Sequence, residues 1–223
     1  MSDATPKAVL WDFDGTLIDS EPIWAQGERA VMHRRDVPWD NSHDASFVGQ
    51  SMETTARHMA RALGDEELWP ELANEVEIYV AKRLGEALPW IDGARELLED
   101  VAGRGVRMAV VTASSNRILE AARPHLERYV DTIVTSNDVV NHKPHPEAYL
   151  TAMTRLGMGA QECLVVEDSV PGVASGRAAG AVVYAVPAPI VEMEPQPHVR
   201  ICRGRLTATT WDDLVDTWLT LRP

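Results

Sequence analysis

The sequence predicts a three-layer α/β fold, in which helices cover both faces of a parallel sheet and a second, all-helical unit follows the first strand. Three observations predict it: nearly continuous apolar runs that suit buried parallel strands, helical periodicity beside the later runs, and a long strand-free stretch after the first. The 223 residues are 45% hydrophobic and 25% charged. They suffice for one large domain or a main domain with an insertion.

Five short apolar runs are the predicted strands. They occupy residues 8–13, 107–112, 132–136, 163–168 and 181–186. Apolar residues recur every three or four positions in residues 94–104, 118–126 and 146–156, as they do in helices. This alternation of strand and helix predicts parallel strands joined by right-handed crossovers.

The first strand and the helix at residue 94 are separated by about eighty residues without a convincing strand, far more than a crossover needs. Within this stretch, residues 51–63 and 71–84 show helical periodicity, the first with Ser51 as its expected N-cap. We therefore predict a core domain of residues 1–19 and 93–223 and a helical domain of residues 20–92.

Composition excludes several classes of protein. A net charge of −13 leaves no basic face for general nucleic-acid binding. Cys163 and Cys202 lie far apart, which excludes a zinc ribbon or disulfide scaffold and fits a reducing cytosol. The N-terminus lacks a signal-peptide pattern, and the longest apolar stretch, residues 178–191, is interrupted by prolines. We expect a soluble, cytoplasmic monomer without membrane or nucleic-acid partners.

The strongest chemical signal is the segment VLWDFDGTLIDS around the end of the first strand. Asp12 and Asp14 project to the same side of an extended chain, and two such carboxylates repel unless a cation lies between them or one is protonated. Gly15 permits a turn closed to other residues, and Thr16 can hydrogen-bond the turned backbone. The alternative for this pattern alone is a solvated strand end with an ordinary turn.

A second signal follows the strand at residues 107–112. Thr112 ends it, and the small residues Ala113, Ser114, Ser115 and Asn116 open a helix. Hydroxyl and free N–H groups at such a helix start can bind an anion. The alternative is ordinary helix capping by Ser114 or Ser115.

Two further signals lie near the ends of later strands. Lys143 stands beside Pro144 and near Pro146 in a chain with three lysines and eighteen arginines, although a solvated lysine is the alternative. Glu167 and Asp168 end the apolar run CLVVED. Burying two acids there needs compensation, most simply by a hard cation; the alternative is the start of a loop.

Together these residues resemble the four motifs of the haloacid dehalogenase superfamily of phosphotransferases. DFDGTLIDSE is similar to its first motif, Thr112 to its second, Lys143-Pro144 to its third and Glu167-Asp168-Ser169 to its fourth. The resemblance spans nearly the whole chain and implies a Rossmann-like core with a helical C1 cap inserted after the first motif. It is closest to the β-phosphoglucomutase-like and sugar-phosphate phosphatase branches.

The resemblance implies roles for the acidic residues. Asp12 would attack phosphorus and form an aspartyl-phosphate, while Asp14 would protonate the leaving alcohol and then deprotonate the attacking water. Mg²⁺ would be held by the Asp12 carboxylate, the backbone carbonyl of Asp14 and Asp168, with Glu167 close by.

The resemblance also implies a substrate-binding set. Residues expected to surround the phosphoryl group are Gly15, Thr16, Thr112, Ala113, Ser114 and Lys143. Substrate choice is expected in the inserted helices, where Glu21, Trp24, Gln50 and Ser51 are the candidates, with Asn116 from the core side. For Trp24, packing among the inserted helices is the alternative role.

Departures from the family's patterns narrow the reaction. Dehalogenases of this fold lack the second aspartate, whereas Asp14 is present, and phosphonate hydrolases need a cap lysine, for which only Lys82 is available. The mutase histidine is replaced by Trp24, and residues 50–52 lack the mutase arginine. The prediction is a Mg²⁺-dependent phosphatase acting on a small phosphorylated metabolite, plausibly a sugar phosphate. The alternatives are a phosphomutase and, more remotely, an inactive binding protein of the same fold.

Overall fold

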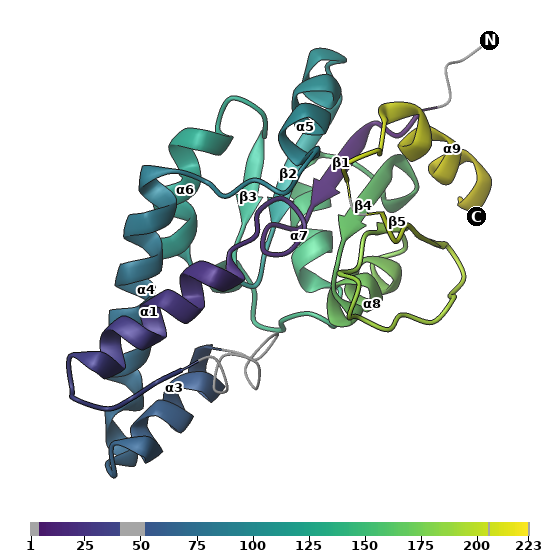
Figure 1. Cartoon of the computed structure of the whole chain (residues 1–223). Coiled ribbons are helices and arrows are strands. Elements are labelled where there is room, and N and C mark those ends of the chain that lie inside the picture. Colours follow the sequence, from purple (N-terminus) through teal and green to yellow (C-terminus); the bar gives the residue numbers. More distant parts are fainter. Residues whose placement is uncertain (1–4, 41–51, 205, 223) are drawn as a thin grey trace.

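The computed structural model describes residues 5–40, 52–204 and 206–222, and a parallel sheet lies at its centre (Figure 1). The described strands are β1 (Ala8–Trp11), β2 (Arg107–Val111), β3 (Thr132–Val134), β4 (Cys163–Glu167), β5 (Val182–Ala185) and β6 (Val199–Ile201). They follow the order β3-β2-β1-β4-β5-β6, and each neighbouring pair is parallel. The predicted Rossmann-like α/β fold is confirmed.

Helices cover both faces of this sheet. The helices that do so are α5 (Ala94–Gly103), α6 (Asn116–Leu126), α7 (Glu147–Leu156), α8 (Val170–Ala178) and α9 (Trp211–Leu221). The other described helices are α1 (Glu21–His33), α3 (Met52–Ala62) and α4 (Trp69–Glu86), and short 3-10 turns lie at Glu66–Leu68, Ser136–Asp138 and Ala160–Glu162. Val9 and Trp11 of β1 join a hydrophobic cluster with α5, α6 and α9, whereas Ala8 and Leu10 join a second cluster with α7 and α8. Because side chains alternate along a strand, these two clusters are the two faces of the sheet.

The five predicted strands correspond to β1 to β5, but β6 was not predicted. This strand has three residues, is only half-buried and pairs with β5 alone. Such a short strand at the edge of the sheet leaves neither a long apolar run nor a clear alternation in the sequence. The helical patterns at residues 94–104, 118–126 and 146–156 correspond to α5, α6 and α7.

Helices α1, α3 and α4 lie between β1 and α5 in the chain and group together at the lower left of Figure 1. Buried side chains, among them Met32 of α1, Met59 of α3 and Leu72 of α4, hold the three helices together. Gly27 allows α1 to approach α4 closely, since a Cβ at this position would lie 3.2 Å from the Tyr79 ring.

The two chain segments that connect these helices to the sheet lie side by side. The amide of Asp19 donates to the carbonyl of Pro89 at 2.9 Å, and the amide of Ile91 donates to the carbonyl of Leu17 at 2.9 Å. The inserted helices therefore leave and rejoin the core at one place, directly after the DFDG segment.

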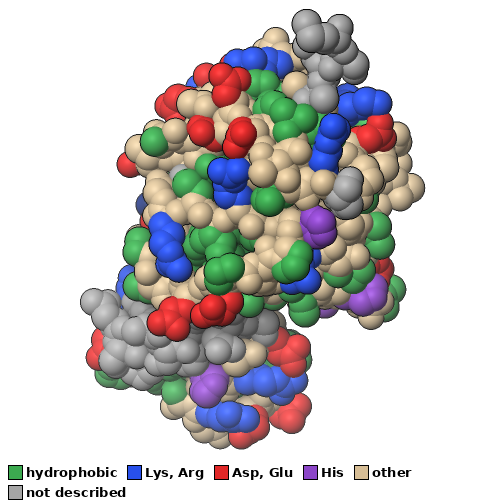
Figure 2. Space-filling view, turned by 90° about the vertical axis from the view of Figure 1, so that its right-hand side faces the viewer, with side chains coloured by type: hydrophobic (Ala, Val, Ile, Leu, Met, Phe, Trp, Pro, Cys, Tyr) green, Lys and Arg blue, Asp and Glu red, His purple; other side chains and the backbone are tan. Residues whose placement is uncertain are grey.

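Charged side chains of both signs lie on the surface of the described residues. Many form local ion pairs along helices, such as Arg95 with Glu99 and Arg104 with Asp100, both at i,i+4 spacing. Figure 2 shows basic and acidic side chains interspersed over the described part of one face. Among the described residues, none of the helices combines the length and apolar character needed to cross a membrane.

Candidate active site

Asp12 follows β1 at its carboxyl end and is 5% exposed. Its Oδ1 accepts a hydrogen bond of 2.7 Å from Lys143 Nζ, whereas its buried Oδ2 has no hydrogen-bond partner among the described residues. Burial raises the pKa of Asp12 well above its ordinary value, opposed by the Lys143 ammonium and reinforced by the Glu167 and Asp168 carboxylates. A buried, unpartnered carboxylate oxygen is costly unless another group satisfies it.

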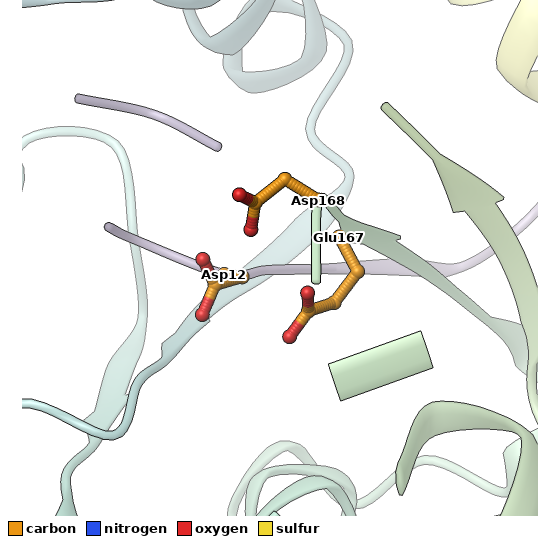
Figure 3. Close-up of side chains that lie close together, drawn as sticks. All are labelled: Asp12, Glu167 and Asp168. Carbon is orange, nitrogen blue, oxygen red and sulfur yellow. The ribbon is translucent and has the colours of Figure 1, made fainter. Parts of the chain in front are cut away.

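Three carboxylates gather beyond the ends of β1 and β4 (Figure 3). Oxygen atoms of Asp12, Glu167 and Asp168 all lie within 4.8 Å of one another. Burial, with the nearby Glu167 carboxylate, raises the pKa of Asp168 to about 7. Among the described residues, one Asp12 oxygen lacks a partner and Lys143 is the ammonium group in contact with these hard oxygen donors, which together fit a divalent cation such as Mg²⁺.

Lys143 is held in this group from the loop between β3 and α7. Its ammonium donates to Asp12 Oδ1 at 2.7 Å, Glu167 Oε1 at 2.7 Å and the Val111 carbonyl at 2.9 Å. Burial alone would lower the pKa of Lys143, but the Asp12 and Glu167 carboxylates raise it well above its ordinary value. With its side chain 8% exposed, Lys143 is not the solvated lysine considered as the alternative.

The loop carrying Lys143 is anchored at both sides. Ser175 of α8 donates to the His145 carbonyl at 2.7 Å, and Glu147 of α7 accepts from the amides of Val140 and Asn141 at 2.7 and 3.0 Å. These contacts fix the backbone on either side of Lys143, and the fixed backbone helps to position its ammonium between Asp12 and Glu167.

The side chain of Asp14 faces a different set of groups from Asp12. Its Oδ2 accepts from Thr112 Oγ1 at 3.1 Å and Ser114 Oγ at 2.7 Å, and its Oδ1 accepts from Ser20 Oγ at 2.5 Å. The acidic group of Figure 3 consists of Asp12, Glu167 and Asp168, and the carboxylate of Asp14 is bonded to hydroxyl groups instead. Ser20 was missed from the sequence, although it ends the DFDGTLIDS segment.

Gly15 and Thr16 support Asp168. Gly15 has a φ of +87°, and a Cβ there would lie 2.2 Å from Asp168 Oδ2, so only glycine fits. The sequence suggested that the Thr16 hydroxyl bonds the turned backbone. In the structure it donates to Asp168 Oδ1 at 3.3 Å. The turn after β1 thus shapes the position of an acid from β4.

The start of α6 is not capped in the ordinary way. Ser115 occupies the N-cap position without a side-chain cap, its hydroxyl is buried without a partner among the described residues, and Ser114 bonds Asp14 instead. Asn116 accepts from Thr135 Oγ1 at 2.5 Å through its side chain, which is thereby engaged away from Asp14. The loop at the end of β3 therefore braces the segment that holds Asp14.

The remaining candidates are distributed as follows. Ala113 is exposed in the segment after β2, and Glu21 is exposed at the start of α1. Trp24 is partly buried and packs against the large hydrophobic cluster, in keeping with the packing role considered for it. Gln50 and Ser51 lie outside the described residues.

Comparisons with known proteins agree with this arrangement. The family model described as haloacid dehalogenase-like hydrolase matches residues 9–186. Validoxylamine A 7′-phosphate phosphatase from Streptomyces hygroscopicus subsp. limoneus is 34% identical over 177 residues, 78% of this chain and 82% of that protein. Phosphorylated carbohydrates phosphatase from Thermotoga maritima is 29% identical over 176 residues, with the same coverage of 78% and 82%.

A solved structure also resembles the whole fold. The crystal structure of a HAD hydrolase, family IA, variant 3, from Entamoeba histolytica superposes with a TM-score of 0.80 at 25% identity. The similarity covers 95% of this chain and 99% of that one, so it includes the inserted helices as well as the sheet.

Proposed function

We propose, from the premise that this chain belongs to the haloacid dehalogenase-like hydrolases, that it is a Mg²⁺-dependent phosphatase working through an aspartyl-phosphate. The chain is a phosphoric monoester hydrolase, as its relatives named as phosphatases support. Their names include a phosphorylated carbohydrate, which favours a sugar phosphate as the small phosphorylated metabolite that this chain hydrolyses.

One observation carries the proposal: the buried Asp12 carboxylate has one oxygen fixed by Lys143 and the other unpartnered among the described residues. A carboxylate nucleophile divides a slow hydrolysis into two easier displacements. In the first, an Asp12 oxygen bonds to phosphorus while the bond from phosphorus to the alcohol oxygen breaks. In the second, water bonds to phosphorus, and Asp12 is released as inorganic phosphate leaves.

Protons in both steps are assigned to Asp14. It would donate a proton to the departing alcohol oxygen and later take one from the attacking water. Its hydrogen bonds to Thr112, Ser114 and Ser20 hold the carboxyl group at the rim of the site during both steps.

Positive charge for the transferred phosphoryl group would come from Lys143 and the metal. Asp12 and Asp168 would hold Mg²⁺ with the Asp14 carbonyl, and the bound ion would neutralise charge on the phosphoryl oxygens. Lys143 already donates to three acceptors, so its contact with a phosphoryl oxygen would replace one of these bonds.

Residues 20–92 would serve as the cap that selects the substrate, since the core groups proposed above would contact only the phosphoryl group. Glu21 and Trp24 remain candidates for that role from α1. Two expectations from the sequence, a cytoplasmic location and a monomeric state, stay predictions.

The test is phosphate release from p-nitrophenyl phosphate and a panel of sugar phosphates by the wild type and Asp12→Asn. We expect turnover that EDTA abolishes and Mg²⁺ restores, and a loss of at least about 10³-fold in the variant, because the nucleophile is removed. Asp212→Asn, an exposed aspartate on α9, is the matched control and should keep full activity. Full activity of Asp12→Asn would exclude the aspartyl-phosphate, whereas an isomerised sugar phosphate as product would indicate a phosphomutase.

A further inference from the structure

Tyr149 of α7 contacts Glu167 and Lys143, although none of the motifs identified in the sequence includes it. Its side chain is fully buried, and its hydroxyl donates to Glu167 Oε1 at 3.1 Å. The Lys143 ammonium lies 5.0 Å from the centre of its ring, a distance suited to a cation–π contact. Tyr149 therefore touches Glu167 through its hydroxyl and Lys143 through its ring.

Glu167 is the residue through which this contact acts. Its Oε1 accepts from Lys143 and Tyr149, and its Oε2 accepts from the amide and the hydroxyl of Ser169 at 2.9 and 3.0 Å. The carboxylate is 0% exposed, and a Cβ at Gly172 would lie only 1.6 Å from Oε1. Four donors and a tight backbone wall leave Glu167 one position.

A carboxylate fixed in this way gives its partner a fixed position too. Glu167 Oε1 is one of three acceptors for the Lys143 ammonium, and the other two are the Val111 carbonyl and Asp12 Oδ1. If Glu167 Oε1 moved, the Lys143 ammonium would turn with it, and its N–H groups would point less directly at Asp12 Oδ1. The Tyr149 hydroxyl is the second donor to Oε1, and it restrains the same oxygen that accepts from Lys143.

We propose that Tyr149 is a positioning residue, which orients Glu167 and thereby holds the Lys143 ammonium against the nucleophile Asp12. The kinetic consequence rests on the proposed phosphatase function, but the position of the ammonium does not. Burial also raises the pKa of Tyr149 well above its ordinary value, which keeps the hydroxyl a donor.

Tyr149→Phe is the variant that isolates the hydroxyl, because it keeps the ring, its packing and its contact with the ammonium. Tyr184→Phe is the matched control: Tyr184 is also buried, and its hydroxyl shares a hydrogen bond of 3.2 Å with Thr209 Oγ1 on another part of the sheet. Both variants lose one buried hydroxyl, so a loss of thermal stability common to both measures the structural effect alone.

The first measurement observes the ammonium directly in protein labelled with ¹⁵N-lysine. The chain has three lysines, and Lys7 and Lys82 are exposed, so their ammonium protons exchange rapidly with water. We expect one slowly exchanging Nζ signal, absent from Lys143→Arg, that shifts and exchanges faster in Tyr149→Phe and is unchanged in Tyr184→Phe. An identical signal in wild type and Tyr149→Phe would overturn the proposal, as would equal changes in both tyrosine variants.

The second measurement is the turnover of p-nitrophenyl phosphate by the same proteins. Tyr149→Phe should lower kcat about tenfold, as expected for a lost hydrogen bond to a charged group, and leave KM unchanged because Tyr149 does not face substrate. An unchanged kcat would overturn the kinetic consequence. Absence of turnover in the wild type would instead refute the proposed function, and the ammonium signal would still decide the role of Tyr149.

Discussion

Two groups of ion-paired side chains in this molecule shift the pKa of their carboxylates in opposite directions. In the strand-end cluster (Asp12, Lys143, Glu167 and Asp168), burial raises the pKa of Asp12 well above its ordinary value. In the inserted-helix network (Arg34, Arg35, Glu71 and Glu75), hydrogen bonds from Arg35 and then Arg34 lower the pKa of Glu75 to about 2.

Burial and the balance of charge explain the difference. In the strand-end cluster, the Lys143 ammonium pairs with Asp12 and Glu167, and Asp168 adds a third carboxyl group. The Glu167 side chain is 0% exposed. In the inserted-helix network, both arginines contact Glu75, which is 24% exposed. The two arginines of the network balance its two glutamates. The strand-end cluster has three carboxyl groups and one ammonium, so its acidic groups outnumber its cation. Buried acidic groups that outnumber their cations are typical of metal-binding and catalytic sites.

Removal of the single ammonium should have the largest effect on stability. Lys143→Met leaves Asp12 and Glu167 buried without their cation, so the free energy of unfolding should fall by about 3–5 kcal/mol. Urea unfolding at neutral pH in EDTA measures it. Lys82→Met, an exposed lysine of α4, is the control and should cost less than about 0.5 kcal/mol. Equal effects of the two variants would remove the contrast between buried and exposed charge.

The next effect concerns pH in the metal-free protein. Because the pKa of Asp168 is raised to about 7, its protonated form favours the folded state, and this contribution is lost as the pH rises from about 4 through 7. Stability should fall over that range with a slope of at most about 1.4 kcal/mol per pH unit from this group. Asp168→Asn should flatten the slope, while Asp212→Asn keeps it.

Addition of Mg²⁺ extends the same measurement. The ion binds deprotonated carboxylates, so it should stabilise the wild type most above pH 7 and Asp168→Asn much less. If, without metal, the free energy of unfolding rose between pH 4 and 7 in the wild type but not in Asp168→Asn, the raised pKa of Asp168 would be contradicted.

The strand-end cluster was largely predictable from the sequence, because its three carboxylates end long apolar runs. Asp12, Glu167 and Asp168 stand at the ends of strands with a continuous apolar character, and the carboxyl ends of parallel strands meet at one edge. Lys143 lies in a loop, and its place between prolines was the signal that singled it out. The order of the motifs along the chain then predicted which side chains would converge.

Other parts of the site could not be predicted, because their role depends on side-chain direction. Tyr149 is one of several buried residues on α7, and nothing in its spacing distinguishes a hydroxyl aimed at Glu167 from ordinary packing. The hydrogen bond from Thr135 to the Asn116 side chain joins residues nineteen positions apart, and the expectation that Asn116 faces the substrate stays a prediction. Contacts between loops of different strands leave no periodic signal in the sequence.

The smallest effect is expected in the inserted-helix network. Glu75→Gln removes a carboxylate bonded to Arg35 at 2.5 Å and to Arg34 at 2.6 Å, and should lower the free energy of unfolding by about 1 kcal/mol at pH 7. Since the pKa of Glu75 is lowered to about 2, its stabilisation is present above about pH 4.5 and is lost as the pH falls toward 2. The variant and the wild type should therefore converge at acid pH.

Glu71→Gln is the control for this variant, since Glu71 is 60% exposed and its ion pair is with Arg35. Its loss should be smaller than that of Glu75→Gln at every pH. Both variants should keep the wild-type kcat, because the network joins the residues that follow α1 to α4, and its charges are paired with one another. A fall in kcat on Glu75→Gln, with stability otherwise as expected, would show that the inserted helices transmit their electrostatics to the strand-end cluster, and the two regions would then have to be treated as one.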